Sequence, residues 1–190
     1  MSNIWITADT HFNHVNICGP KISNWESGYR NFDTLYQMNG TIIDNINSLV
    51  KEDDVLYHLG DFAMGQRKYV ADLRNKLQCK TIHLIRGNHD NVKRIPEGTF
   101  ASIEHYCEVR VGKLLVCMSH YPFASWNEVG RGSIQLHGHC HGSYEARGRQ
   151  LDVGMDCHVF HPLALEDIVK DMKEKPVKTV DHHNKQTSYH

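Results

Sequence analysis

The sequence lacks the features that mark disulfide-rich secreted proteins and membrane proteins. Its six cysteines are scattered, with no Cys-x-x-Cys pair, which predicts reduced thiols and not a disulfide framework. No apolar run approaches the length that crosses a bilayer, and Asp9 and His11 interrupt the apolar amino-terminal segment at once. These absences predict a cytoplasmic protein without a membrane segment.

The sequence also lacks an excess of charge of either sign. Lys and Arg number 21 and Asp and Glu 22, which gives a net charge of -1. Binding to long nucleic acid without regard to its sequence, or to an anionic membrane, needs a basic surface, so the composition does not favour these partners. With 190 residues, 40% of them hydrophobic, we expect a single domain over residues 1–175 and a flexible polar tail over 176–190.

Apolar periodicity predicts strands that alternate with amphipathic helices, and therefore an α/β fold. The expected strands are 4–8, 55–59, 82–85, 106–111, 114–118, 134–136 and 149–153, and the expected helices are 33–50, 66–77 and 162–172. Gly112-Lys113 is a hairpin signal between two of the strands, and Pro162 is expected to open the last helix.

Residue types that bind divalent metals recur where the expected strands end. The chain has 15 histidines, and imidazole is the commonest metal ligand in proteins. The candidate ligands at five strand ends are Asp9, His11, Asp61, Asn88, His120, His139 and His141. In an extended backbone residues i and i+2 point the same way, so Asp9 and His11 are predicted to bind one ion together.

A polar tetrad, Gly87-Asn88-His89-Asp90, follows the strand at 82–85. Gly87 permits a sharp bend, Asn88 offers an amide oxygen, and Asp90 is placed to orient the imidazole of His89. Taken alone, the tetrad is also compatible with an ordinary Asn-rich turn. His58, in contrast, is expected to lie in the core.

The seven candidate ligands exceed the four that one tetrahedral ion takes. The sequence therefore predicts two divalent ions that share a carboxylate. Mixed oxygen and nitrogen donors without a cysteine pair favour Mn²⁺, Fe or Zn²⁺ and leave Ni²⁺ and Mg²⁺ open. Cys140 is expected to point away from the histidines on either side of it.

Together these motifs resemble those of the calcineurin-like metallophosphoesterase superfamily, in the family's order and over residues 9–141. The motifs are Asp9-x-His11, Gly60-Asp61, Gly87-Asn88-His89-Asp90, His120 and Gly138-His139-x-His141. The resemblance implies a four-layer αββα sandwich of two mixed β-sheets flanked by helices. It also implies one ion held by Asp9, His11, Asp61 and His141, and a second held by Asp61, Asn88, His120 and His139.

The resemblance further implies an enzyme that hydrolyses phosphate esters with a water activated between the two ions. His89, oriented by Asp90, is the implied general acid. Four more residues are expected near the centre. Arg86 would contact phosphate or form a structural ion pair, and His14, Asp156 and His158 would have outer-shell or structural roles.

We expect a small phosphorylated substrate, with a phosphodiester such as a cyclic or short nucleotide slightly preferred, because so short a chain has no room for a large capping domain. Phe12 stands where many members have glycine, and Asp61 lacks the Asp-Arg-Gly continuation of Ser/Thr protein phosphatases. The alternatives are a nuclease of the same superfamily, a phosphomonoesterase, or a non-catalytic scaffold. The sequence leaves the oligomeric state open.

Overall fold

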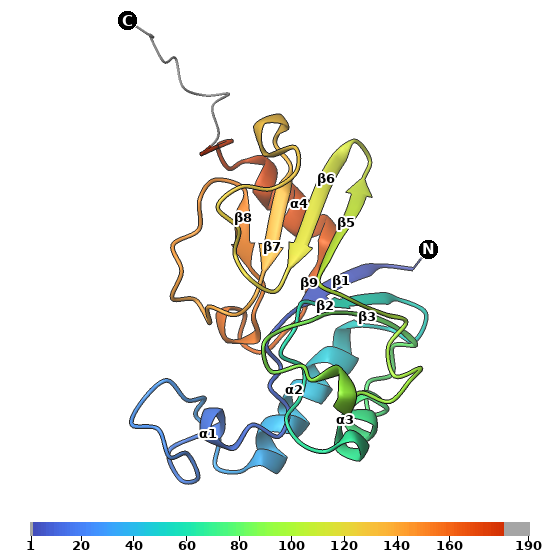
Figure 1. Cartoon of the computed structure of the whole chain (residues 1–190), viewed down its shortest axis with the longest axis vertical. Helices are drawn as coiled ribbons and strands as arrows, with labels where there is room; N and C mark the ends of the chain where they lie inside the picture. Colours follow the sequence, from blue (N-terminus) through green and yellow to red (C-terminus); the bar gives the residue numbers. More distant parts are fainter. Residues whose placement is uncertain (1, 181–190) are drawn as a thin grey trace, which may run out of the picture.

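Two mixed β-sheets form the centre of the fold, which a computed structural model describes over residues 2–180 (Figure 1). The first sheet has the order β4-β3-β2-β1-β9 and the second has the order β5-β6-β7-β8. The strands are β1 (Ile4–Thr7), β2 (Val55–His58), β3 (Thr81–Ile85), β4 (Ser102–Glu104), β5 (Tyr106–Val111), β6 (Leu114–Ser119), β7 (Ile134–His137), β8 (Gln150–Asp152) and β9 (Leu163–Ala164). Strands β1 to β4 run parallel and β9 antiparallel, whereas β6 to β8 run parallel and β5 antiparallel.

The helices are α1 (Val15–Cys18), α2 (Leu35–Leu49), α3 (Arg67–Arg74) and α4 (Leu165–Lys173), with 3₁₀ turns η1 (Val92–Arg94), η2 (Val129–Arg131) and η3 (Met155–Cys157). Helices α1, α2 and α3 cover the first sheet on the face that points away from the second, whereas α4 packs into the other core. Thr34 caps α2 by accepting a hydrogen bond from the amide of Gln37. The buried stripe of α2, including Met38 and Ile42, shares a core with Leu56 and α3.

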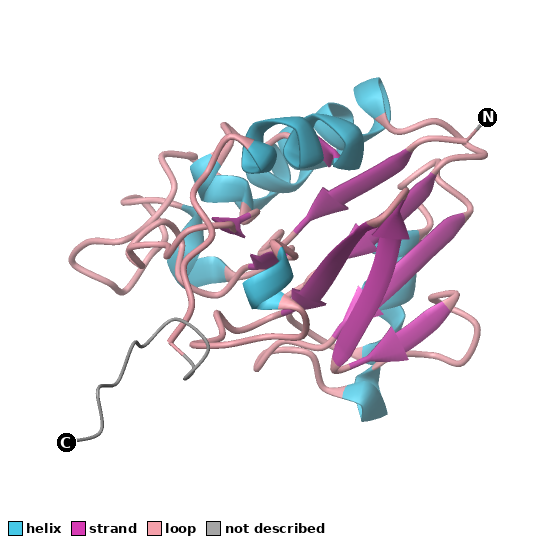
Figure 2. Cartoon of the chain, turned by 90° about the horizontal axis from the view of Figure 1, so that it is seen from above, coloured by secondary structure: helices cyan, strands magenta, loops and turns pink. Residues whose placement is uncertain are grey.

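The second core lies between the sheets. Alternation along the strands sends Ile6 of β1 and Val116 of β6 into this core. Helix α4 adds Ile168 and Met172 to it. The neighbours of Val116 face outward, where Trp126 and the segment around η2 cover them. Helices flank the two mixed sheets, as Figure 2 shows, and the predicted α/β fold of two mixed sheets flanked by helices is confirmed.

Most predicted elements are found within a few residues of their expected positions, with two corrections. The last helix begins at Leu165 and not at Pro162, because Leu163–Ala164 first pair with β1 as β9. Strand β4 was not predicted, since three residues are too few to show a period. Within residues 2–180, no helix has both the length and the apolar character needed to cross a membrane.

The domain boundary at residue 175 stays a prediction. Val177 lies beside Gly132 and Lys178 lies beside Gly148, so part of the expected tail contacts the second half of the chain. The rest of that tail, residues 181–190, lies outside the described residues.

Candidate metal centre

The carboxyl ends of five strands converge and bring the candidate ligands together. Strands β1, β2 and β3 come from the first sheet, and β6 and β7 come from the second. Two groups that combine Asp and His each have three ligand atoms within 4.8 Å of one another: Asp9 with His11 and His141, and Asp61 with His120 and His139. A third group that meets the same distance limit contains only histidines, namely His11, His14 and His89. The side-chain oxygen of Asn88 adds to the second group, 3.1 Å from Nε2 of His120.

Asp61 lies between the two groups. Its Oδ2 is 3.6 Å from Nε2 of His11 and 3.5 Å from Nε2 of His120. Ligand atoms about 2.0–2.2 Å from one ion lie roughly 3–3.6 Å from each other in tetrahedral or octahedral geometry. The position of this oxygen therefore fits a carboxylate shared by two ions.

The burial and protonation of the first group, as well as the distances, fit a metal ion. Asp9 is completely buried, and its Oδ1 has no hydrogen-bond partner among the described residues. A buried carboxylate oxygen without a partner is costly, and a cation would satisfy it. Burial lowers the pKa of His11 to about 2, so its imidazole is neutral, as a ligand must be.

Hydrogen bonds fix which nitrogen of two histidines faces the centre. Nδ1 of His120 lies 2.8 Å from the carbonyl oxygen of Leu59 and donates to it, which leaves Nε2 as the free ligand atom. In the same way, Nδ1 of His141 lies 2.6 Å from Oδ2 of Asp156. Asp156 thus contacts the centre through His141, without joining either ligand group.

The backbone at the ligands differs from the expected extended conformation. Five candidate ligands have positive φ angles: Asp9 (56°), His11 (47°), Asp61 (56°), His139 (70°) and His141 (47°). The prediction that extended backbone aligns Asp9 with His11 was wrong, because the chain turns at once after β1 and its amides bond to the loop after β2. Residues other than glycine rarely adopt this left-handed region, and such strain is typical of functional sites.

Gly87 is needed for a close approach at the shared carboxylate. A β-carbon at this position would overlap Oδ1 of Asp61 and would lie 2.6 Å from the Asp61 amide nitrogen. Oδ1 of Asp61 instead accepts a hydrogen bond of 2.8 Å from the amide of His89. Because Gly87 has no side chain, the loop after β3 can approach Asp61 closely enough for the amide of His89 to bond to its carboxylate.

Arg30 is a buried residue of the centre that sequence reasoning missed. Its guanidinium donates to both carboxylate oxygens of Asp156 at 2.8 Å, and to the backbone carbonyls of Asp9 and Thr10. The two partners lie 126 residues apart in the chain. Arg30 sits in an irregular loop without periodicity, so no local signal indicated its role.

We expect Arg30→Gln to lower the free energy of unfolding by about 3 kcal/mol or more, because it removes the guanidinium that pairs with Asp156 and donates to the buried carbonyls of Asp9 and Thr10. The urea midpoint of the metal-free protein measures this loss. The control is Lys21→Gln, which removes an exposed ion pair of 3.0 Å with Asp33 and should cost less than about 1 kcal/mol. Equal small losses in the two variants would contradict a structural role for Arg30.

A comparison with known proteins decides the family. A family model for calcineurin-like phosphoesterases matches residues 2–190. The chain belongs to the calcineurin-like phosphoesterase family. Members use divalent metals, in agreement with the two groups of His and Asp ligand atoms.

Several relatives match this calcineurin-like phosphoesterase along most of their length. An uncharacterized protein of Methanocaldococcus jannaschii is 29% identical in an alignment of 191 positions that covers 95% of this chain and 98% of the relative. The Gene 66 protein of Mycobacterium phage D29 is 26% identical in an alignment of 205 positions that covers 90% of this chain and 96% of the relative. The crystal structure of a protein of unknown function from Aquifex aeolicus has a TM-score of 0.66 at 22% identity and covers 90% of this chain and 99% of its own.

In this phosphoesterase, His89 faces the two groups of ligand atoms, with Nε2 4.0 Å from Oδ2 of Asp61. The predicted contact with Asp90 is wrong. The Asp90 carboxylate accepts hydrogen bonds from the amides of Asp61, Phe62 and Gly87 at 2.8 to 3.0 Å. The chain bends after β3, where the amide of Asp90 donates to the carbonyl of Gly87. The Asp90 carboxylate points inward and holds the loop that carries Asp61.

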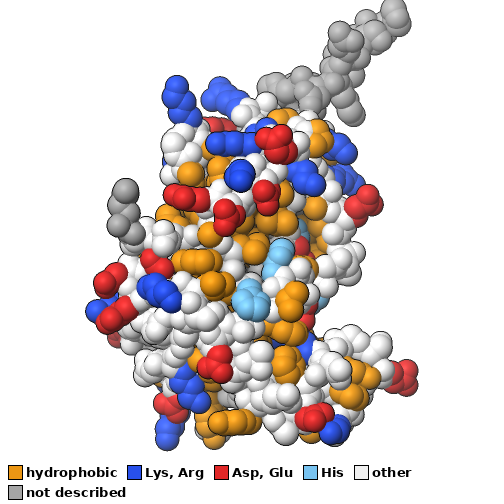
Figure 3. Space-filling view, turned by 180° about the vertical axis from the view of Figure 1, so that it is seen from behind, with side chains coloured by type: hydrophobic (Ala, Val, Ile, Leu, Met, Phe, Trp, Pro, Cys, Tyr) orange, Lys and Arg blue, Asp and Glu red, His pale blue; other side chains and the backbone are white. Residues whose placement is uncertain are grey.

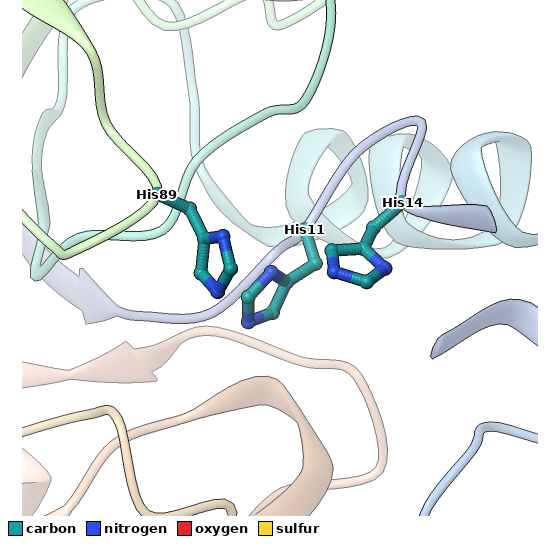
Figure 4. Close-up of side chains that lie close together, drawn as sticks. All are labelled: His11, His14 and His89. Atoms are coloured by element: carbon teal, nitrogen blue, oxygen red, sulfur yellow. The ribbon is translucent and has the colours of Figure 1, made fainter. Parts of the chain in front are cut away.

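The rings of His11 and His14 lie against His89 instead (Figure 4). Their centroids are 5.3 Å and 5.6 Å from that of His89, in edge-to-face contact. Nδ1 of His14 accepts a hydrogen bond from the amide of Ile17 at the start of α1. His14 therefore lies beside His89 on the open side of the centre.

The remaining candidates have structural contacts. Nε of Arg86 donates to the carbonyl of Asp90 at 3.3 Å, and Arg86 forms no ion pair among the described residues. Nε2 of His158 lies 2.8 Å from the carbonyl oxygen of Asp152. His58 is completely buried, as predicted, and Cys140 lines the cleft beside the centre without joining either ligand group.

Metal uptake should release protons near neutral pH. Burial raises the pKa of Asp9 to about 7 in the metal-free protein. Burial alone would lower the pKa of His120, but the hydrogen bond to Asp61 and the negative charges of Asp61 and Asp9 together raise it above the usual value. Because an ion displaces these protons, metal affinity should fall as pH drops below about 7 and level off above it.

Calorimetric titration of the metal-free protein with Mn²⁺, below and above neutral pH and in two buffers of different ionisation enthalpy, measures this proton release. We expect more protons released per ion at the lower pH. Affinity and proton release that do not vary with pH would show that Asp9 is already ionised before metal binds.

Proposed function

We propose that this protein is a dinuclear metal-dependent phosphoesterase that hydrolyses phosphodiesters. The observation that carries the proposal is the Asp61 oxygen, nearly equidistant from His11 in one ligand group and His120 in the other. Asp9, His11, Asp61 and His141 would hold one ion, and Asp61, Asn88, His120 and His139 would hold the second. Two such ions, when bound, supply an activated water and stabilise charge on the phosphoryl group.

The side chains around the centre have distinct roles in this proposal. His89 is the general acid, because its Nε2 faces Asp61 while the ring stays partly exposed to the cleft. It donates its proton to the oxygen that leaves phosphorus. Asp90 holds the backbone of Asp61, and Arg30 with Asp156 holds His141. No side-chain nucleophile is required.

The cleft over the centre suits a small phosphodiester. It has a volume of about 400 Å³ and is lined by His11, Asp61, Asn88, His89 and His141 among others. On the face shown in Figure 3, Lys and Arg side chains alternate with Asp and Glu, and no broad basic patch appears. This mixture favours a cyclic or short nucleotide over a long nucleic acid. Mn²⁺, Fe or Zn²⁺ as the native metal, and a cytoplasmic location, stay predictions.

The test is turnover of bis(p-nitrophenyl) phosphate and p-nitrophenyl phosphate by metal-stripped protein resupplied with Mn²⁺, Zn²⁺, Ni²⁺ or Mg²⁺. We expect metal-dependent release of p-nitrophenolate, faster from the diester. Faster release from the monoester would replace the diester preference with a phosphomonoesterase. No turnover by protein that binds two ions per chain would overturn the proposed reaction and favour a scaffold.

A further inference from the structure

The cleft over the metal centre has a second wall that the proposed reaction does not use. One side carries the candidate ligands and His89. The other side comes from α1 and the segments before and after it, and is formed by His14, Ile17, Trp25 and Gly28. Figure 1 shows this segment projecting beside α1, away from the two sheets. Its side chains in the cleft are apolar or aromatic.

Trp25 is the exposed tryptophan of this wall. Its side chain is 46% exposed, whereas Trp126 is buried at 9% and Trp5 packs against the core below the first sheet. The centroid of Trp25 lies 5.5 Å from that of His14, at an interplanar angle of 57°. An exposed indole at the mouth of a polar cleft offers a large apolar face to a ligand.

The two aromatic rings form a path that leads outward from the reacting group. His14 contacts His89 on one side and Trp25 on the other. The bond between Nδ1 of His14 and the amide of Ile17 fixes the His14 ring in this place. A substituent on a phosphate held near His89 would therefore reach His14 first and Trp25 next.

We propose that Trp25 and His14 form the subsite for a planar nucleobase carried by the substrate. The pentose that separates a phosphate from its base would extend from His89 along His14 toward Trp25, since His14 contacts both of the other rings. Among the described residues, those lining the cleft include no Lys or Arg, so this wall suits a neutral planar group better than a further phosphate. Stacking on an aromatic side chain is tolerant of base identity.

This inference deepens the proposed function by naming the substrate as a nucleotide, and it rests on phosphate binding at the centre. Its test is therefore a binding measurement that needs no turnover. Adenosine 5′-monophosphate and ribose 5-phosphate carry the same sugar and phosphate and differ in the base. Calorimetry on the metal-loaded protein gives the dissociation constant of each.

We expect adenosine 5′-monophosphate to bind about 10-fold or more tightly than ribose 5-phosphate, and Trp25→Ala to remove most of that difference. Trp25→Ala should leave the affinity for ribose 5-phosphate unchanged, and Trp25→Phe should keep most of the preference for the base. Tyr36→Ala is the control, because Tyr36 is 88% exposed and lines a different groove between α2 and α3.

A second readout is tryptophan fluorescence, which adenosine 5′-monophosphate should quench in the native protein and much less in Trp25→Phe. Equal affinities for the two ligands, or an equal loss of both in Trp25→Ala, would overturn the subsite. Tighter binding of adenosine 5′-monophosphate than of ribose 5-phosphate, by a protein that does not hydrolyse bis(p-nitrophenyl) phosphate, would support the subsite and contradict the proposed reaction. A short oligothymidylate that binds as tightly as thymidine 5′-monophosphate would indicate that the base can belong to a single strand.

Discussion

Asp61→Asn should reduce the turnover of bis(p-nitrophenyl) phosphate by more than 100-fold, since loss of residues that only orient a metal ligand typically costs about 10- to 100-fold. The physical reason is the position of Oδ2, which lies within 3.6 Å of a nitrogen of each ligand group. A neutral amide would remove one negative charge from between two cations. We therefore also expect the variant to hold fewer than two ions per chain, as measured by elemental analysis after dialysis.

Two further variants separate the metal-binding role of Asp61 from general damage. Asp44→Asn changes an exposed carboxylate on α2 and should leave metal content and turnover unchanged. Asp156→Asn should have an intermediate effect, because Asp156 acts through His141. Two tightly bound ions and near-native turnover in Asp61→Asn would exclude Asp61 as the shared ligand.

His89→Ala should give the second large effect, and its size should depend on the leaving group. General acid catalysis typically contributes about 10²- to 10⁴-fold. An alkoxide leaves poorly without a proton, so cleavage of a methyl or nucleoside ester should fall by most of this range. The p-nitrophenolate ion leaves readily, so bis(p-nitrophenyl) phosphate should be affected much less. Parallel measurement of kcat on the two kinds of substrate gives the ratio.

Metal content provides the accompanying test for His89. We assign it no ligand role, so His89→Ala should retain two ions per chain. His105→Ala, a change at an exposed histidine that contacts Arg86 at 3.3 Å, is the matched control. An equal loss on both substrates together with loss of metal would identify His89 as a ligand in place of a proton donor.

The sequence predicted much of the fold and the position of the centre because both depend on local patterns. Short apolar runs marked β1, β2 and β3, and each was followed by a residue of a type that binds metals. Parallel strands bring their carboxyl ends to one edge, so the convergence of Asp9, Asp61 and Asn88 followed from the pattern alone. The family resemblance then supplied the grouping of the ligands.

The parts that could not be predicted depend on contacts between distant segments or on backbone geometry. Arg30 meets Asp156 across 126 residues, and no period or motif links two single residues so far apart. The left-handed conformation of Asp9 and His11 is imposed by pairing with the loop after β2. The inward direction of the Asp90 side chain could not be predicted, because adjacency to His89 in the sequence does not show that its carboxylate accepts from the amide of Asp61.

The ligands come from both sheets, and this has a mechanical consequence for the whole molecule. Bound ions would cross-link the two sheets at one end, so separating the sheets would require breaking coordination bonds as well as exposing apolar surface. The metal-loaded protein would then lose both sheets in one cooperative transition. A small shift of one sheet against the other would also change the spacing of two bound ions. In the proposed reaction, the core that Ile6 of the first sheet and Val116 of the second share would therefore help to set the distance between the ions.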